Sequence, residues 1–223
     1  MFAQMRSLDS LPMISRIREW RIDRITDRIA RRPHGRRARS VYGAPDVHSF
    51  AWEPVLDALR LAPDDVLIDV GCGGGVFLRR ALETGCRATG LDHSPEMIRL
   101  TREKNAEAVR TGRLQIVYGS AEELPFEDGE FTAVSSIVAF LFFSDPLRVL
   151  REMRRVLDRK RGRLAIFTTP PELKGTPAAP YPLATRGHFY DDAALERLAL
   201  EAGFADASVT GTQIGAQLLV ATG

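Results

Sequence analysis

Short apolar runs alternate with helical patterns through the middle of the chain, and this alternation predicts its architecture. The clearest helical stretch begins at Ser94-Pro95-Glu96, where an N-cap residue, a first-turn proline and a first-turn acid follow one another. Strands that alternate with helices of this length form a parallel sheet covered by helices on both faces. The runs with the length and composition of buried strands are residues 66–70, 88–92, 114–118, 131–137 and 163–168.

The C-terminal part of the chain completes this sheet in a different way. A proline-rich loop follows residue 168, then a helical pattern over 191–202 and two further apolar runs at 207–214 and 217–221. The last two runs are joined by only a few residues, so they are expected to pair antiparallel. The predicted fold is therefore an α/β, Rossmann-like, seven-stranded and mostly parallel sheet with an antiparallel C-terminal strand.

The first 60 residues have a different pattern. Apolar residues between Leu11 and Ile29 recur at helical spacing, although Arg18 and Arg21 interrupt their face. Pro33 and Gly35 are expected to end this helix, and a second short helix is expected over 49–59. We predict two units: residues 1–60 form a helical, basic lid segment, and residues 61–223 form the main domain.

Composition and charge are those of a globular protein with a basic N-terminal appendage. The 223 residues are 44% hydrophobic and 27% charged, which excludes global disorder. The first 50 residues hold eleven arginines and five acidic residues, a net charge of +6, whereas the whole chain carries only +2. Packing of this segment over the main domain accounts for its pattern without a partner; contact of residues 16–39 with a membrane or a nucleic acid is the alternative.

Several classes of site and location are disfavoured by what the sequence lacks. Cys72 and Cys86 have no histidine at metal-ligand spacing, so we expect reduced thiols and no metal. The longest apolar stretch is far shorter than the roughly 20 residues of a bilayer span, and the N-terminus lacks the apolar core of a secretory signal. We expect a cytoplasmic protein, and the sequence does not predict its oligomeric state.

A glycine-rich loop at residues 71–75 follows the first strand and marks the predicted ligand site. Its glycines let a ligand approach the backbone, and Asp92 ends the next strand, where a carboxylate can bind a ribose diol. A dinucleotide fingerprint requires glycine at the sixth loop position, which is Val76 here. The carboxylate of Asp69, two residues before the loop, would repel a pyrophosphate and attract an ammonium group. The pattern favours adenosine joined to a cationic amino acid.

The chain from about residue 66 to 221 resembles the class I S-adenosylmethionine-dependent methyltransferases, in their small-molecule branch. The segments that carry the resemblance are DVGCGGG (69–75), GLDHS (90–94), GSAEELP (119–125) and RVL (155–157) through Arg163-Leu164. The resemblance implies that S-adenosylmethionine is the cofactor. The cofactor-binding residues that it implies are Asp69, Gly71, Cys72 and Gly73 for the methionine part, Asp92 for the ribose, His93, Ser120, Ala121 and Glu122 for the adenine, and Ser136 after these.

Three positions depart from the family pattern. Ser120 stands where many relatives carry an aspartate beside the adenine, so the contact is expected either to pass to Glu122 or to weaken. The alternative role for Glu122 is to cap a helix. Thr132 replaces a common aspartate, and residues 158–162 replace a short Pro-Gly turn. These departures concern affinity and not the fold.

The implied reaction is transfer of the sulfonium methyl group to a substrate nucleophile. His188, at the end of the proline-rich loop, is the predicted general base among four histidines. Residues 135–143 lack the Asn/Asp-Pro-Pro-Tyr device of base and glutamine methyltransferases, and Phe140–Phe143 could instead wall an apolar pocket. We expect a small, partly apolar metabolite as substrate. The alternatives are a lipid-headgroup or RNA methyltransferase that uses the basic arm, or a non-methylating protein that binds S-adenosylmethionine.

Overall fold

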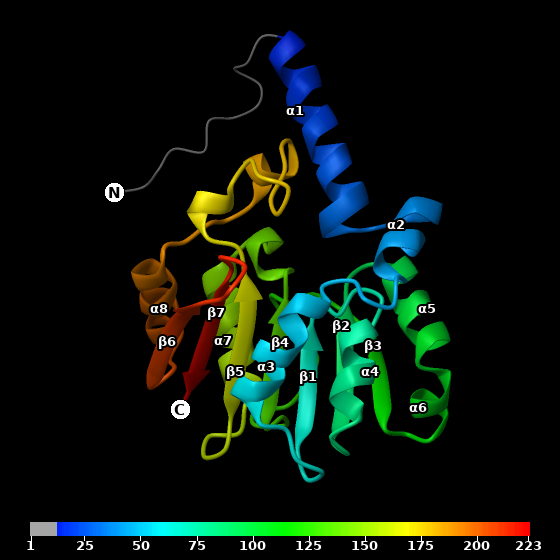
Figure 1. Ribbon diagram of the computed structural model, residues 1–223, viewed down its shortest axis with the longest axis vertical. Helices are drawn as coiled ribbons and strands as arrows, with labels where there is room; N and C mark the ends of the chain where they lie inside the picture. Colours follow the sequence, from blue (N-terminus) through cyan, green and yellow to red (C-terminus); the bar gives the residue numbers. More distant parts are fainter. Residues whose placement is uncertain (1–12) are drawn as a thin grey trace.

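The computed structural model describes residues 13–223, whose centre is one seven-stranded sheet with helices on both faces (Figure 1). The strand order is β3-β2-β1-β4-β5-β7-β6, and β7 runs antiparallel to both of its neighbours. This confirms the predicted fold, including the antiparallel C-terminal strand. The strands are β1 (Val66–Val70), β2 (Arg87–Asp92), β3 (Leu114–Tyr118), β4 (Ala133–Ile137), β5 (Arg163–Thr168), β6 (Asp206–Gly211) and β7 (Gln217–Thr222).

The helices follow the predicted order with small changes at their ends. They are α1 (Met13–Thr26), α2 (Gly35–Tyr42), α3 (Trp52–Leu59), α4 (Val76–Leu82), α5 (Pro95–Lys104), α6 (Ala106–Arg110), α7 (Pro146–Val156) and α8 (Asp192–Glu201), with a π-helical turn η2 (Asp27–Arg31) after α1. The helical stretch that begins after Ser94 is divided at Asn105 into α5 and α6. The Asn105 side chain is turned back to donate to the carbonyls of Thr101 and Gly75, which ties α5 to the glycine loop.

Alternation of side chains along the strands divides the core into two layers. Leu67 lies on the face packed against α3 and α4, whereas the next residue, Ile68, lies on the face packed against α7 and α8. Both residues are fully buried. Because successive strand residues point to opposite faces, the short run VLIDV supplies both layers at once. No helix within residues 13–223 is both long and apolar enough to cross a membrane.

The N-terminal segment differs from the prediction in two respects. Gly35, expected to end helical structure, begins α2 with φ of +80°, a conformation that glycine adopts without strain. The expected apolar stripe does not pack on the domain: Ile25 and Ile29 are each 41% exposed, while Leu11 lies outside the described residues. The reason is that Glu19 and Asp23 occupy the inward side of α1, where ion pairs with a loop arginine replace apolar packing.

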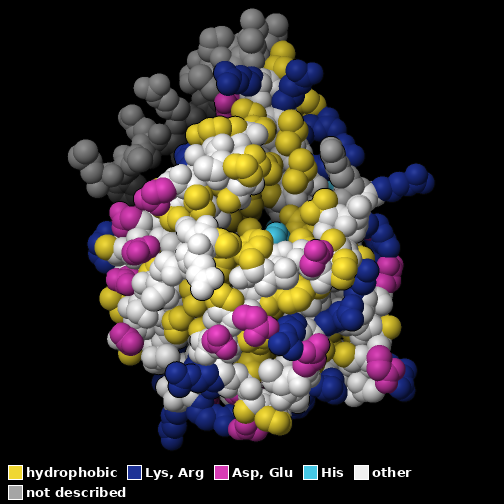
Figure 2. Space-filling model, viewed as in Figure 1, with side chains coloured by type: hydrophobic (Ala, Val, Ile, Leu, Met, Phe, Trp, Pro, Cys, Tyr) yellow, Lys and Arg dark blue, Asp and Glu magenta, His cyan; other side chains and the backbone are white. Residues whose placement is uncertain are grey.

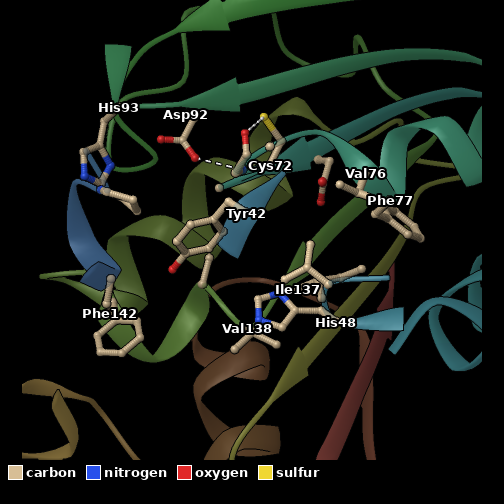
Figure 3. Close-up of a pocket in the computed structure, with 18 of the residues that line it drawn as sticks. Tyr42, His48, Cys72, Val76, Phe77, Asp92, His93, Ile137, Val138 and Phe142 are labelled. Carbon is tan, nitrogen blue, oxygen red and sulfur yellow. Dashed lines mark hydrogen bonds between the residues drawn. The ribbon is translucent and has the colours of Figure 1, made fainter. Parts of the chain in front are cut away.

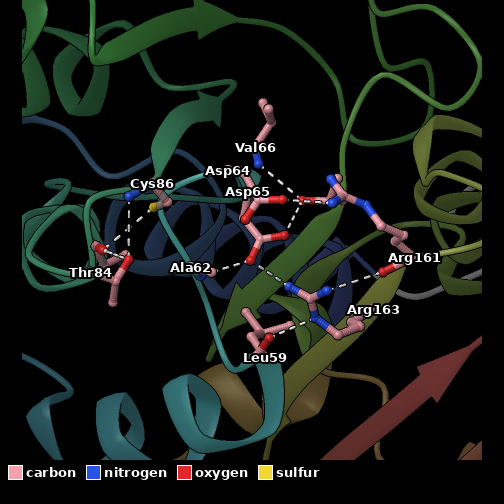
Figure 4. Close-up of polar contacts among 11 residues, drawn as sticks. Leu59, Ala62, Asp64, Asp65, Val66, Thr84, Cys86, Arg161 and Arg163 are labelled. Carbon is pink, nitrogen blue, oxygen red and sulfur yellow. Dashed lines mark hydrogen bonds and ion pairs between the residues drawn. The ribbon is translucent and has the colours of Figure 1, made fainter.

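A buried polar cluster joins three strands at the end of the sheet where these strands begin (Figure 4). The Asp65 carboxylate accepts hydrogen bonds from the Thr132 hydroxyl (2.6 Å), the Ala62 N–H (2.8 Å) and the Arg163 guanidinium (2.8 Å). Burial alone would raise the pKa of Asp65, but these three donors hold it below its usual range. Thr132 also accepts from the Val66 N–H, so the threonine that replaces the family's aspartate belongs to this cluster.

We expect Asp65→Ala to lower the free energy of unfolding by about 3 kcal/mol, because it leaves Arg163 and Thr132 without a buried partner. The matched control is Asp64→Ala, which breaks an exposed ion pair with Arg161 and should cost less than about 1 kcal/mol. Urea unfolding of both variants checks the difference. Equal losses in the two variants would contradict the role of the cluster.

Candidate ligand-binding site

A pocket opens at the carboxyl ends of β1, β2 and β4, beneath the N-terminal segment (Figure 3). It holds about 910 Å³ of space, counted to its open mouth, and the space-filling view shows the molecule hollowed there (Figure 2). The carboxyl ends of parallel strands are where ligands bind in open α/β sheets. The pocket therefore lies where the strand pattern predicts a site.

The glycine loop forms the floor of this pocket. Gly71 and Cys72 donate their backbone N–H groups to the Leu91 carbonyl at 2.8 and 3.0 Å, which ties the loop to β2. Gly71 has φ of +77°, and a Cβ added to it would lie 2.6 Å from the Ala139 side chain. A larger residue at position 71 is therefore disfavoured both by backbone conformation and by space.

Asp92 is the polar centre of the site. One carboxylate oxygen accepts the Gly73 N–H at 3.0 Å and the other accepts the Ser94 N–H at 2.8 Å. The side chain is buried, and burial raises its pKa against the effect of these bonds and of the neighbouring His93. The two backbone bonds hold the carboxylate in one orientation toward the pocket.

Asp69 is a second buried carboxylate in the lining of the pocket. It is only 2% exposed and accepts a hydrogen bond from the Ser135 hydroxyl at 2.8 Å. Burial raises its pKa to about 7, the Ser135 bond opposes this change and the charge of Asp92 adds to it. None of the described residues that line the pocket is a lysine or an arginine. The pocket thus presents two buried carboxylates with no lysine or arginine in its described lining.

Residues of the N-terminal segment form the roof. The Tyr42 ring would lie 3.4 Å from a Cβ on Gly73, and its hydroxyl donates to the Ile29 carbonyl at 2.8 Å. The Ser94 hydroxyl donates to the Pro33 carbonyl at 2.7 Å, which joins the roof to the start of α5. Burial raises the pKa of Tyr42 to about 12, with a further contribution from the charge of Asp92, so its hydroxyl stays protonated.

Two residues in the wall have strained backbones. His48 and Val138 both have φ of +58°, and this conformation is unusual for a β-branched residue such as valine. The His48 ring packs edge-on against Tyr42 and Phe50, with centroid distances of 6.3 and 6.0 Å. Burial lowers the pKa of His48, so its imidazole is neutral near pH 7. The sequence pattern contained no motif around His48 and therefore did not single it out.

The structure brings together six of the eleven predicted site residues and leaves five outside the pocket lining. The six are Asp69, Gly71, Cys72, Gly73, Asp92 and His93. Ser136 is buried in β4 and donates to the Val70 carbonyl. Ser120, Ala121 and Glu122 follow β3, and the Glu122 carboxylate accepts the Asp145 N–H at the start of α7. His188 donates its backbone N–H to the Leu141 carbonyl.

The apolar run after β4 is shared between the pocket and the core. Phe142 and Phe143 line the pocket, whereas Phe140 and Leu141 are buried in the protein interior. Half of this run therefore walls the pocket and half belongs to the core, as the spacing of the four residues predicts. Across residues 13–223, no three His, Cys, Asp or Glu side chains are grouped in a way that could hold a metal ion.

Comparison with known proteins points to one family. Residues 68–166 match the family described as a methyltransferase domain. The chain is 32% identical over 154 residues to the sarcosine/dimethylglycine N-methyltransferase of Halorhodospira halochloris, and this match covers 61% of the chain and 54% of that protein. It is 36% identical over 118 residues to the demethylmenaquinone methyltransferase of Thermotoga maritima, covering 52% and 48%. The chain spans about half the length of these curated relatives.

The fold matches as well. A crystal structure of a SAM-dependent methyltransferase from Aquifex aeolicus superimposes with a TM-score of 0.69, covering 83% of this chain and 96% of that one. The sequence identity is 19%, so this likeness shows the fold alone. The sequence resemblance and the architecture agree.

The raised pKa of Asp69 predicts a pH dependence of stability. The folded protein retains a proton that the unfolded chain releases near pH 4, so this group's contribution to stability is lost as pH rises toward about 7. The Asp69→Asn side chain cannot ionise. The free energy of unfolding of this variant, relative to that of the wild type, should therefore increase between pH 4 and 7 by at most about 1.4 kcal/mol per pH unit. Above pH 7 the difference should level off. Denaturant unfolding from pH 5 to 8 measures this difference. A constant difference would show that Asp69 ionises normally.

Proposed function

We propose that this chain, which contains a class I S-adenosylmethionine-dependent methyltransferase domain, transfers the methyl group of that cofactor to a small, partly apolar metabolite. One observation carries the proposal: Asp69 and Asp92 are buried in a pocket whose described lining has no lysine or arginine. Such a site disfavours a pyrophosphate and suits a ligand with a diol and positive charge. The bound cofactor supplies the electrophilic sulfonium methyl group, and the protein supplies orientation and exclusion of water.

The residues of the pocket fit this cofactor. The backbone bonds of Asp92 leave each carboxylate oxygen with capacity to accept a ribose hydroxyl. Asp69 lies beside the glycine loop, where an ammonium group would lower its pKa and stabilise the ionised form. Gly71 and Gly73 have no side chains, so the methionine part of the cofactor can approach the backbone closely at the floor of the pocket. We assign His93, which lines the same pocket, to the adenine side.

Part of the pocket lining is apolar and aromatic. Trp52, Phe142 and Phe143 are among the residues that line the pocket. We propose that the acceptor lies against it, because apolar side chains favour a substrate with apolar surface. The two curated relatives are named for small-molecule substrates, which is consistent with this class of acceptor.

We propose that the part of residues 1–60 that precedes α3 acts as a lid over the site, because α3 itself packs in the core of the sheet. The Arg186 guanidinium in the proline-rich loop pairs with Asp23 at 2.7 Å and with Glu19 at 2.5 Å, so α1 is held against that loop. Pro33 and Tyr42, from the same segment, line the pocket directly. A covering of this kind excludes water from the methyl group. Two free, buried cysteines are consistent with our assignment to the cytoplasm.

We also propose His48 as the general base in place of His188. The His48 ring lines the pocket together with Asp69 and Val138, and its pKa is lowered by burial, so it can accept a proton at neutral pH. His188 is not among the residues that line the pocket. The strained backbone at His48 is the kind of feature that proteins retain at functional sites.

Asp92→Ala should weaken binding of S-adenosylhomocysteine about ten- to a hundredfold, the loss expected for hydrogen bonds to a charged group. Titration calorimetry measures the affinity, with NAD as the ligand that the wild type should not bind. Asp128→Ala, whose exposed carboxylate pairs with Arg155 outside the pocket, is the control and should bind normally. Unchanged affinity in a folded Asp92→Ala protein, or binding of NAD alone, would overturn the assignment of the cofactor.

The role of His48 predicts two results. In NMR titrations, the His48 imidazole should titrate below pH 6.5, and its signals should shift when S-adenosylhomocysteine is added. His48→Asn should reduce methyl transfer to small acceptors at least about 100-fold, with cofactor affinity changed less than threefold. His188→Asn is the matched control and should keep its activity. Loss of activity in the control but not in His48→Asn would return the role to His188.

A further inference from the structure

The outer face of α1 has an unusual distribution of charge. Four arginines, Arg18, Arg21, Arg24 and Arg28, are exposed on α1 and η2. The acidic side chains described in these two elements, Glu19, Asp23 and Asp27, are all at least partly buried, and the first two pair with Arg186. The Glu19 and Asp23 carboxylates thus face the protein, whereas the four guanidinium groups are exposed. The exposed side of α1 and η2 is therefore rich in positive charge.

Large apolar side chains share this surface. Ile17 is 51% exposed, Trp20 56%, and Ile25 and Ile29 41% each, so four of the ten exposed large hydrophobic residues of the described chain lie on α1 and η2. Arg24 stacks its guanidinium on the Trp20 ring, 4.6 Å from the centroid. Figure 2 shows dark blue and yellow side chains together on this projecting part of the molecule. We call these eight residues the α1 outer face: Ile17, Arg18, Trp20, Arg21, Arg24, Ile25, Arg28 and Ile29.

We propose that the α1 outer face docks on an anionic lipid surface. Arginines near such a surface are attracted by its negative potential, and isoleucine and tryptophan side chains gain free energy by entering the boundary between headgroups and acyl chains. Arginine is suited to this mixture, because its aliphatic stem lies along apolar groups while its charge stays at the headgroups. A nucleic acid would satisfy the arginines but would leave the exposed isoleucines in water, so the apolar half of the face favours lipid.

The α1 outer face is connected to the roof of the pocket. The chain runs from α1 through η2 to Ala30 and Pro33, and both of these residues line the pocket. Docking of α1 therefore brings the roof of the pocket to the lipid boundary. An amphiphilic acceptor could then enter from the lipid without crossing bulk water. This consequence rests on the proposed function, whereas the docking itself does not.

The test uses the full chain and vesicles of two compositions, phosphatidylcholine alone and phosphatidylcholine with 30% phosphatidylglycerol. We expect co-sedimentation with the anionic vesicles and little with the neutral ones, and weaker binding at 0.5 M than at 0.1 M salt. In a Trp52→Phe background Trp20 is the remaining tryptophan, and its fluorescence should shift to shorter wavelength on binding. None of these readouts requires methyl transfer, so failure here leaves the proposed function untouched.

Two variants separate the parts of the face. The arginine variant is Arg18→Gln/Arg21→Gln/Arg24→Gln. It should lower the partition coefficient for anionic vesicles roughly 100-fold, because each lost charge is expected to lower it about fivefold. Ile25→Ser/Ile29→Ser keeps every charge and should also weaken binding, with a smaller Trp20 shift. The matched control, Arg87→Gln/Arg159→Gln/Lys160→Gln, removes three exposed charges at the opposite end of the sheet and should bind as the wild type does.

Three outcomes would overturn the proposal. The first is absence of binding to anionic vesicles. The second is an equal loss of vesicle binding in the control and in the arginine variant. The third is salt-sensitive binding to a single-stranded RNA that is stronger than binding to the vesicles and does not shift Trp20 fluorescence. The last result would assign the arginines to a nucleic acid. Circular dichroism of each variant shows whether it is folded. If the arginine variant does not fold, the isoleucine variant still tests the proposal.

Discussion

The bonds from two backbone N–H groups to the Asp92 carboxylate determine the shape of the site. Gly73 belongs to the loop after β1 and Ser94 to the start of α5, so one side chain from β2 positions both. Thr101 of α5 and Asn105, which follows α5, reinforce the arrangement by donating to the carbonyls of Gly73 and Gly75. The loop is therefore held from β2 and α5 before any ligand arrives, which reduces the entropy that binding must overcome.

Buried carboxylates have different surroundings at the two ends of the sheet. At one end, the Asp65 carboxylate is fully hydrogen-bonded and has an arginine beside it. At the other, Asp69 and Asp92 share a pocket, and the charge of one raises the pKa of the other. Buried like charges without an opposite charge beside them destabilise the folded state, and proteins keep them where a bound ligand supplies the opposite charge.

Much of the sheet was predictable because its strands are short, apolar and separated by clear helix starts. The strand pattern also predicted Asp69 and Asp92 near the carboxyl ends of two neighbouring strands, and both line the same pocket. The N-terminal segment was not predictable in the same way, because its inward contacts are ion pairs with Arg186, more than 150 positions later in the sequence. Helical periodicity detects apolar stripes, and here the apolar residues face outward. His48 was missed because its position in the pocket depends on this segment.

The roof is attached to the rest of the molecule mainly by polar contacts. Arg186 holds α1, and the Arg39 ion pairs with Glu96 and Glu103 hold α2. Among the described side chains of α1, η2 and α2, Ala38 and Tyr42 add a small apolar contact with α5. Such contacts break at much lower free energy than a sheet core, so the segment can open while the strands stay paired. Under the lid role that we propose, departure of a product is a gated step with its own rate, and a faster chemical step would not by itself increase turnover.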